Sequence, residues 1–182
     1  METIKWGFDP LHSELEFKIR HLMISHVSGS FKSFKIDLET RGDDFETAKV
    51  RAVIDIASID TRNEQRDNHL RNSDFFEADT YPQMIFESTE VVKVSEHEYT
   101  LHGNLQLKGV TRPVILEVVY SGIIRDPFGS RRGGFTVSGK IRRSDFGLSY
   151  NAVLETGGVA LGEEVKISAE LQFIREAAAV PA

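Results

Sequence analysis

The chain has 182 residues, a formal net charge of −6, 40% hydrophobic residues and 27% charged residues, which suits one folded domain and is too apolar for a disordered protein. It contains no run of Lys or Arg that could follow a phosphate backbone, and this argues against nucleic acid as a partner. It also contains no cysteine, so thiolate chemistry is excluded and a zinc site would need His and carboxylate ligands.

The two ends of the chain carry little structural information. The first residues, METIKWGFDP, lack the basic segment and apolar run of a signal peptide, and no stretch reaches the length of a transmembrane helix. We therefore expect a cytoplasmic protein without stable membrane insertion, or a periplasmic one if the chain is a processed form. The last residues, EAAAVPA, offer nothing to bury, so we expect a single domain over 1–175 and a frayed tail over 176–182.

Alternating apolar and polar residues begin near residue 14. Leu15, Phe17 and Ile19 share one parity, while Glu16 and Lys18 share the other, and this period of two predicts a half-buried strand. The same test succeeds repeatedly down the chain. It predicts about eight strands, near residues 14–23, 28–38, 49–56, 83–94, 99–108, 113–124, 135–142 and 165–173.

One long segment breaks the alternation. Residues 58–82, SIDTRNEQRDNHLRNSDFFEADTYP, have no period of two. Thr61 followed three residues later by Glu64 is the spacing of a capping box, which predicts a short polar helix over about 62–71. A second turn is expected to begin at Ser73. The sheet is therefore interrupted by a helical insertion at about 60–80.

Short polar connections favour antiparallel pairing between neighbouring strands. Several antiparallel strands with one apolar face form either a closed barrel or a sandwich, since an open sheet would leave that face in water. An eight-stranded barrel encloses packed side chains or one small ligand. A cavity is plausible because small residues occur at the inward parity, namely Ser13, Ala52, Ser88, Gly103, Gly139 and Ala169.

Short motifs stand in order along nearly the whole chain: Trp6, Asp9, HS at 12–13, Phe17, His21, GSF at 29–31, SIDTRNEQRDNHLRNSDFF at 58–76, YPQMIFES at 81–88, GNLQLKGVTRPV at 103–114 and RRSDFGL at 142–148. This series resembles the YceI-like family of bacterial polyisoprenoid-binding proteins. The resemblance implies an all-β, eight-stranded antiparallel lipocalin-like barrel, a long apolar pocket for a polyisoprenoid or other long-chain lipid, and frequent homodimers. Many relatives carry an export signal, which is missing here. The resemblance does not identify the ligand.

The candidate ligand-binding residues are inward-facing or rim positions. His21 shares the parity of Phe17, so it is either a hydrogen-bonded core residue or a polar contact to a ligand head group. Phe75 and Phe76 close the barrel end either as core or as a lid. The full set comprises Ser13, Phe17, Ile19, His21, Phe31, Arg66, His69, Phe75, Phe76, Met84, Phe86, Leu101, Phe135, Val137 and Arg143.

Arg143 continues the inward parity of Phe135 and Ile141, where a charge must be paired. It either forms an ion pair with a carboxylate such as Asp145 or Asp67, or anchors a diphosphate or carbonyl head group at the barrel mouth. The helical insertion carries a second basic group, which is either a solvated helix face or part of the site. Its members are Arg62, Arg66, His69 and Arg71.

Three classes of function are compatible with these residues. His12, His21 and His26 differ in parity or lie in turns, so they are not expected to converge on a metal, and we predict no cofactor. GxSxG, HExxH and P-loop motifs are absent, so no catalytic residue is assigned. We predict non-enzymatic binding, storage or transport of a long apolar lipid. The alternatives are a protein-interaction or stress-response protein and a small hydrolase.

Overall fold

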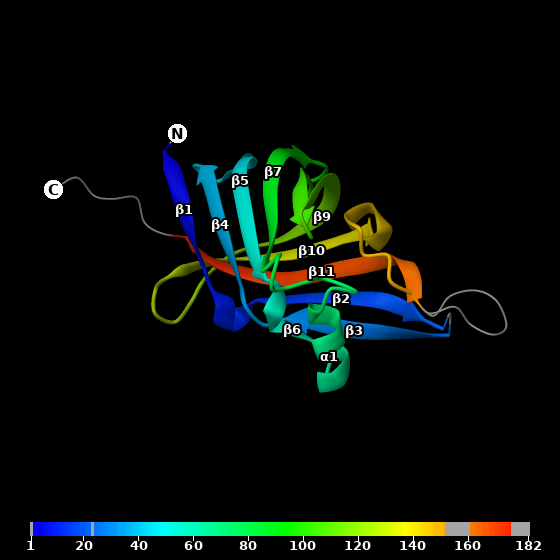
Figure 1. Ribbon diagram of the computed structural model, residues 1–182. Helices are drawn as coiled ribbons and strands as arrows, with labels where there is room; N and C mark the ends of the chain where they lie inside the picture. The colour runs from blue at the N-terminus through cyan, green and yellow to red at the C-terminus, as the bar shows by residue number, and fades with distance from the viewer. Residues whose placement is uncertain (1, 23, 152–160, 176–182) are drawn as a thin grey trace.

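The strands of the chain form a closed barrel with an additional arm of sheet (Figure 1). A computed structural model describes residues 2–22, 24–151 and 161–175, so the tail predicted over 176–182 lies outside the described residues. The strands are β1 (Thr3–Phe8), β2 (Glu14–His21), β3 (Ser25–Phe31), β4 (Phe34–Arg41), β5 (Asp44–Asp55), β6 (Ile59–Asp60), β7 (Gln83–Lys93), β8 (Glu98–Leu107), β9 (Val110–Arg125), β10 (Arg131–Arg142) and β11 (Leu161–Arg175). The helices are α1 (Glu64–Arg71) and the 3-10 turns η1 (Pro10–His12), η2 (Ile56–Ser58) and η3 (Arg143–Phe146).

The long strand β11 closes the barrel. One of its edges pairs with β10 over the whole range from Glu164 to Arg175. Its other edge is divided, because β1 pairs with Phe173–Arg175 and β2 pairs with residues between Leu161 and Glu170. The ring β1-β4-β5-β7-β8-β9-β10-β11 thus has eight strands, all antiparallel to their neighbours. The predicted eight-stranded antiparallel barrel is confirmed.

Two strands that the sequence pattern placed in the barrel wall lie outside this ring. The arm consists of β2, β3 and β6, and it extends from β11 beneath the barrel (Figure 1). The strand predicted over 28–38 is two strands, because the chain passes from the arm to the ring at Lys32 and Ser33. At this crossing Lys32 N donates to Ser58 O of η2 at 3.2 Å, and Asp55 N at the end of β5 donates to Ser33 O at 3.0 Å.

The first strand, β1, was missed because it is short and carries only two fully buried apolar side chains. Ile4 and Trp6 are buried, and the Trp6 indole N–H donates to Thr40 Oγ1 at 3.0 Å. Trp6 packs on Phe45 with ring centroids 5.5 Å apart, and Phe45 lies 5.3 Å from Phe135. These aromatic rings fill one end of the barrel.

Between β1 and β2 the chain leaves the edge of β11 for the short turn η1. The side chains of the motif that begins at Trp6 maintain the pairing across this interruption. Ser13 Oγ accepts a hydrogen bond from Gln172 N at 3.0 Å and donates to Asp9 O at 2.7 Å, while Asp9 N donates to Gln172 O at 3.0 Å. The interruption lets β1 turn into the ring while β2 continues into the arm.

The helical insertion is confirmed, but its predicted cap is wrong. The N-cap of α1 is Asn63, whose side chain accepts a hydrogen bond from Arg66 N at 3.0 Å. Arg62 has a left-handed backbone with φ of 64°, so the chain turns between Thr61 and the helix. Thr61 bonds instead to the buried Asp67, to which its backbone N donates at 2.9 Å. The turn expected at Ser73 is present over 73–76.

Candidate functional site

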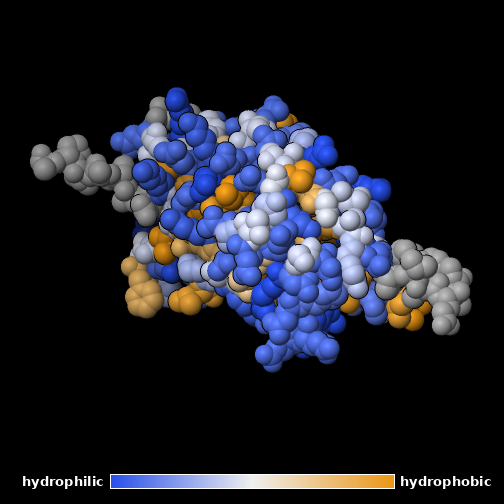
Figure 2. Space-filling view, in the orientation of Figure 1, coloured by the Kyte–Doolittle hydropathy of each residue, from blue (hydrophilic) through white to orange (hydrophobic). Residues whose placement is uncertain are grey.

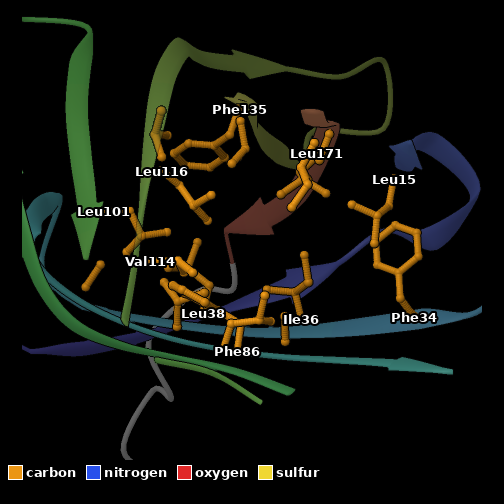
Figure 3. Close-up of a pocket in the computed structure, with 18 of the residues that line it drawn as sticks. Leu15, Phe34, Ile36, Leu38, Phe86, Leu101, Val114, Leu116, Phe135 and Leu171 are labelled. Carbon is orange, nitrogen blue, oxygen red and sulfur yellow. The ribbon is translucent and has the colours of Figure 1, made fainter. Parts of the chain in front are cut away.

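The interior of the ring contains an apolar cavity of about 170 Å³. Hydrophobic side chains from opposite walls point toward one another across it (Figure 3). Leu38 on β4 lies across the ring from Leu116 on β9, and Phe86 on β7 lies across it from Leu171 on β11. The space is lined by apolar side chains and Tyr99. The alternation of side chains along each strand accounts for this lining, because every second residue of a barrel strand faces the interior.

A second cavity, of about 300 Å³, lies between the arm, α1 and the segment that follows β10. Phe17, Ile19 and Val27 line it from the arm, and Phe75 and Phe76 line it from the turn after α1. The two cavities are adjacent, because four apolar residues line both of them. The shared residues are Leu15, Met84, Ile141 and Ile167.

Charged side chains and imidazoles line only the second of these two cavities. The barrel cavity is lined by apolar side chains and Tyr99, whereas the second has two hydroxyls, two imidazoles, a carboxylate and two guanidinium groups among its apolar residues. A chain-like ligand would therefore meet a mainly apolar, uncharged environment at one end and charged hydrogen-bonding groups at the other. The polar lining residues are Glu16, His21, Thr61, Arg66, His69, Arg143 and Tyr150.

Arg143 is the most buried of these charged groups, with 4% of its surface exposed. Its guanidinium donates to three backbone carbonyl oxygens, those of Gly162 at 2.9 Å, Leu148 at 2.7 Å and Tyr150 at 2.7 Å. Burial lowers its pKa, and the nearby Glu163 carboxylate opposes that shift. The predicted ion pair with Asp145 or Asp67 is wrong, because carbonyl oxygens take the place of a carboxylate.

Arg66 and His69 lie on α1, and their side chains line the second cavity. Arg66 donates to Thr61 through Nε to the hydroxyl at 2.8 Å and through Nη2 to the carbonyl at 2.7 Å. His69 Nε2 lies 2.9 Å from Asp74 Oδ2, and its ring packs edge-on against Phe75 at 5.0 Å and Tyr150 at 5.1 Å. Of the predicted basic group, Arg62 and Arg71 do not line either cavity.

Most of the predicted site residues are brought together. The barrel cavity is lined by Phe86, Leu101, Phe135 and Val137, and the second cavity by Phe17, Ile19, His21, Phe31, Arg66, His69, Phe75, Phe76 and Arg143, with Met84 lining both. Ser13 lines neither, because its hydroxyl bridges Asp9 and Gln172 as described above.

Sequence reasoning missed several lining residues. Phe45 precedes the strand predicted near 49–56, but β5 begins at Asp44 and therefore includes it. Leu148 and Tyr150 follow η3 with no regular periodicity, so only their place in or after the RRSDFGL motif could have indicated them. Gly103 and Gly139 do not add free space, because a Cβ there would clash with Phe86 Cζ or Leu116 Cδ2.

The model of the YceI-like domain matches residues 6–173. This chain belongs to the YceI-like family. Its YceI-like relatives include a UPF0312 protein of Staphylococcus epidermidis, 42% identical over 170 residues and covering 93% of this chain and 96% of the relative. A UPF0312 protein of Staphylococcus aureus is 42% identical over 167 residues, covering 91% of this chain and 95% of the relative.

Solved structures share the YceI-like barrel. The YceI protein of Campylobacter jejuni is 30% identical with a TM-score of 0.76, covering 88% of this chain and 91% of that one. BcnA of Burkholderia cenocepacia has a TM-score of 0.80 at 22% identity, covering 91% and 99%. A polyisoprenoid binding domain from Saccharophagus degradans has a TM-score of 0.63 at 16% identity, covering 94% and 98%. The last two likenesses establish the fold alone.

The three N-terminal histidines have separate surroundings in this YceI-like barrel. His12 Nδ1 lies 2.8 Å from Asp9 Oδ2, His21 lines the second cavity, and His26 is exposed on β3. Over residues 2–22, 24–151 and 161–175, no group of three or more His, Cys, Asp or Glu residues is arranged to hold a metal ion. In the same part of the chain, no helix has the length and apolar character needed to span a bilayer.

Proposed function

We propose that this protein binds one long apolar lipid, such as a polyisoprenoid, an isoprenoid quinone or a fatty-acid-like molecule, and stores or transports it without chemical change. The observation that carries the proposal is the shared wall between the two cavities. An apolar tail lies in the barrel cavity, and the polar end of the ligand lies in the second cavity. This orientation follows from the charged side chains and imidazoles, which line only the second of the two cavities.

The polar end suits hydrogen-bond recognition better than catalysis. Arg143 and Arg66 already donate to protein oxygen atoms, which holds the guanidinium planes fixed against the cavity. His69 is oriented by Asp74, but the side chains that line the cavity include no Ser or Cys that it could activate. Membership of the YceI-like family and the fold shared with a polyisoprenoid binding domain support lipid binding.

Extraction and mass spectrometry of lipids from the purified protein test the proposal, and a matched pair of variants locates the site. Ala169 is buried and lines the barrel cavity, while its neighbour Ser168 points outward and is exposed. Ala169→Phe fills the cavity, so we expect it to lower binding of a fluorescent polyprenyl analogue at least about tenfold, with an overpacking cost of about 1–3 kcal/mol in stability.

Ser168→Phe is the control, and it should bind the analogue as the wild type does. A folded Ala169→Phe protein with unchanged affinity would place the ligand elsewhere. Purified wild-type protein that carries no lipid and does not bind the analogue would contradict the proposed function itself.

A further inference from the structure

The end of the β9–β10 hairpin and the turn η1 together expose three large apolar side chains. Leu11 is 89% exposed, Ile124 67% and Phe128 92%. Figure 2 shows hydrophobic surface gathered at the lower left, where the β9–β10 loop and η1 lie in Figure 1. We refer to Leu11, Ile124 and Phe128 as the apolar tip.

The apolar tip is supported by a network of charged side chains. Arg132 donates to Asp126 Oδ2 at 2.9 Å and to Asp9 Oδ2 at 2.5 Å, so it joins the hairpin to the end of β1. Asp9 accepts a hydrogen bond from Leu11 N at 3.1 Å, and Asp126 accepts one from Phe128 N at 2.9 Å. The same three charges therefore fix the backbone beneath two of the exposed side chains.

A row of arginines lies on the same hairpin as Ile124 and Phe128, on the face opposite Ile124, because the Arg131–Arg125 pair and the next pair, Arg132–Ile124, point to opposite faces. Arg131 is directly opposite Arg125 on β9 and Arg175 on β11. Arg175 is paired with Asp43, but within the part of the chain that the structure describes no ion pair is made by Arg125 or Arg131, and both are exposed. Like charges opposite each other across two strands are unfavourable, so an anion bound beside this pair would relieve the repulsion.

We propose that the apolar tip and Arg125–Arg131 form a docking site for the surface of a bilayer that contains anionic lipids. Three separate side chains that are each at least 67% exposed suit an interface that needs no matching shape, such as the boundary between head groups and acyl chains. The two arginines on the same hairpin suit anionic head groups, even though the chain as a whole has a net charge of −6. The inference stands independently of the lipid proposed for the cavities.

Flotation of the full chain with vesicles tests this assignment. We expect binding to vesicles of phosphatidylcholine mixed with phosphatidylglycerol at low salt, and little binding to phosphatidylcholine alone. Phe128→Ser should lower the bound fraction about tenfold, since burial of a Phe side chain is a large share of interfacial affinity. Charge reversal in Arg125→Glu/Arg131→Glu should remove the preference for phosphatidylglycerol.

The matched control is Ile24→Ser, because Ile24 is 86% exposed in the β2–β3 turn, which lies apart from the apolar tip. It should bind vesicles as the wild type does. Phe128→Ser should keep the affinity for the polyprenyl analogue and the wild-type thermal unfolding, so failure of this inference is separable from failure of the proposed function. The docking site would be refuted if the wild type bound neither kind of vesicle. It would also be refuted if Phe128→Ser bound vesicles as the wild type does, or if Ile24→Ser lost as much binding as Phe128→Ser.

Discussion

Replacement of Arg143 by Met should destabilise the protein strongly. The substitution keeps an unbranched side chain of similar length but removes the donors for the carbonyl oxygens of Leu148, Tyr150 and Gly162. A buried acceptor left without a partner costs about 1–3 kcal/mol, which applies in full to the Leu148 carbonyl and less to the partly buried bonds of Gly162 and Tyr150. The chain recovers part of this cost because a buried guanidinium no longer has to be desolvated. We expect the free energy of unfolding to fall by about 3 kcal/mol, and by roughly half of that in Arg143→Lys, whose single ammonium group reaches fewer acceptors.

Urea unfolding, followed by the fluorescence of the single tryptophan, Trp6, measures this loss. Trp6 is buried in the aromatic cluster of the barrel end, so its signal reports the unfolding of the ring and not a local change around Arg143. Arg142→Met is the control, since Arg142 is exposed and its replacement should change stability by no more than about 0.5 kcal/mol. Equal midpoints and equal slopes for the Met variants at 142 and 143 would refute the role given to the carbonyl contacts.

Two further predictions concern pH and assembly. Burial raises the pKa of Asp9, but the hydrogen bonds from His12 and Arg132 outweigh burial and leave the pKa below its usual value. Ionised Asp9 therefore stabilises the folded protein above an unfolded-state pKa of about 3.9. This stabilisation is lost as the pH falls through the lower folded-state pKa. Acid unfolding of Asp9→Asn, compared with the wild type by circular dichroism, should lack this dependence, and parallel curves would contradict the assignment. On the outer face of β9, Ile115 is 59% exposed and Val119 45%, so we expect homodimers that bury this face; Ile115→Lys/Val119→Lys should sediment as a monomer, and a monomeric wild type would contradict the prediction.

The sequence predicted which face of a strand is buried more reliably than which strands are neighbours. Leu15 and Phe17 alternate as a barrel strand does and line the cavities as expected, yet β2 lies outside the ring. Alternation records only burial, and both the ring and the arm bury one face. The division of β11 between β1 and β2 depends on the short turn η1, whose effect on pairing becomes visible only when Gln172 is placed opposite Ser13.

The polar residues show a similar limit. The inward position of Arg143 followed from parity, but its partners did not, because a backbone carbonyl has no signature in the sequence. Thr61 and Glu64 have the spacing of a capping box, yet the left-handed backbone at Arg62 moves the cap to Asn63 and leaves Thr61 to Asp67. Tertiary geometry overrode a local motif at both places.

The two strands on the divided edge of β11 have different roles, because β1 closes the ring and β2 attaches the arm. Within the part of the chain that the structure describes, the arm pairs with the ring only through the ladder between β2 and β11, whereas β1 reaches β11 through residues 173–175 and closes the ring without the arm. Loss of the β2–β11 ladder would therefore leave every pairing between ring strands intact. The closure of the barrel is independent of the arm, although β2 supplies part of the wall of the second cavity.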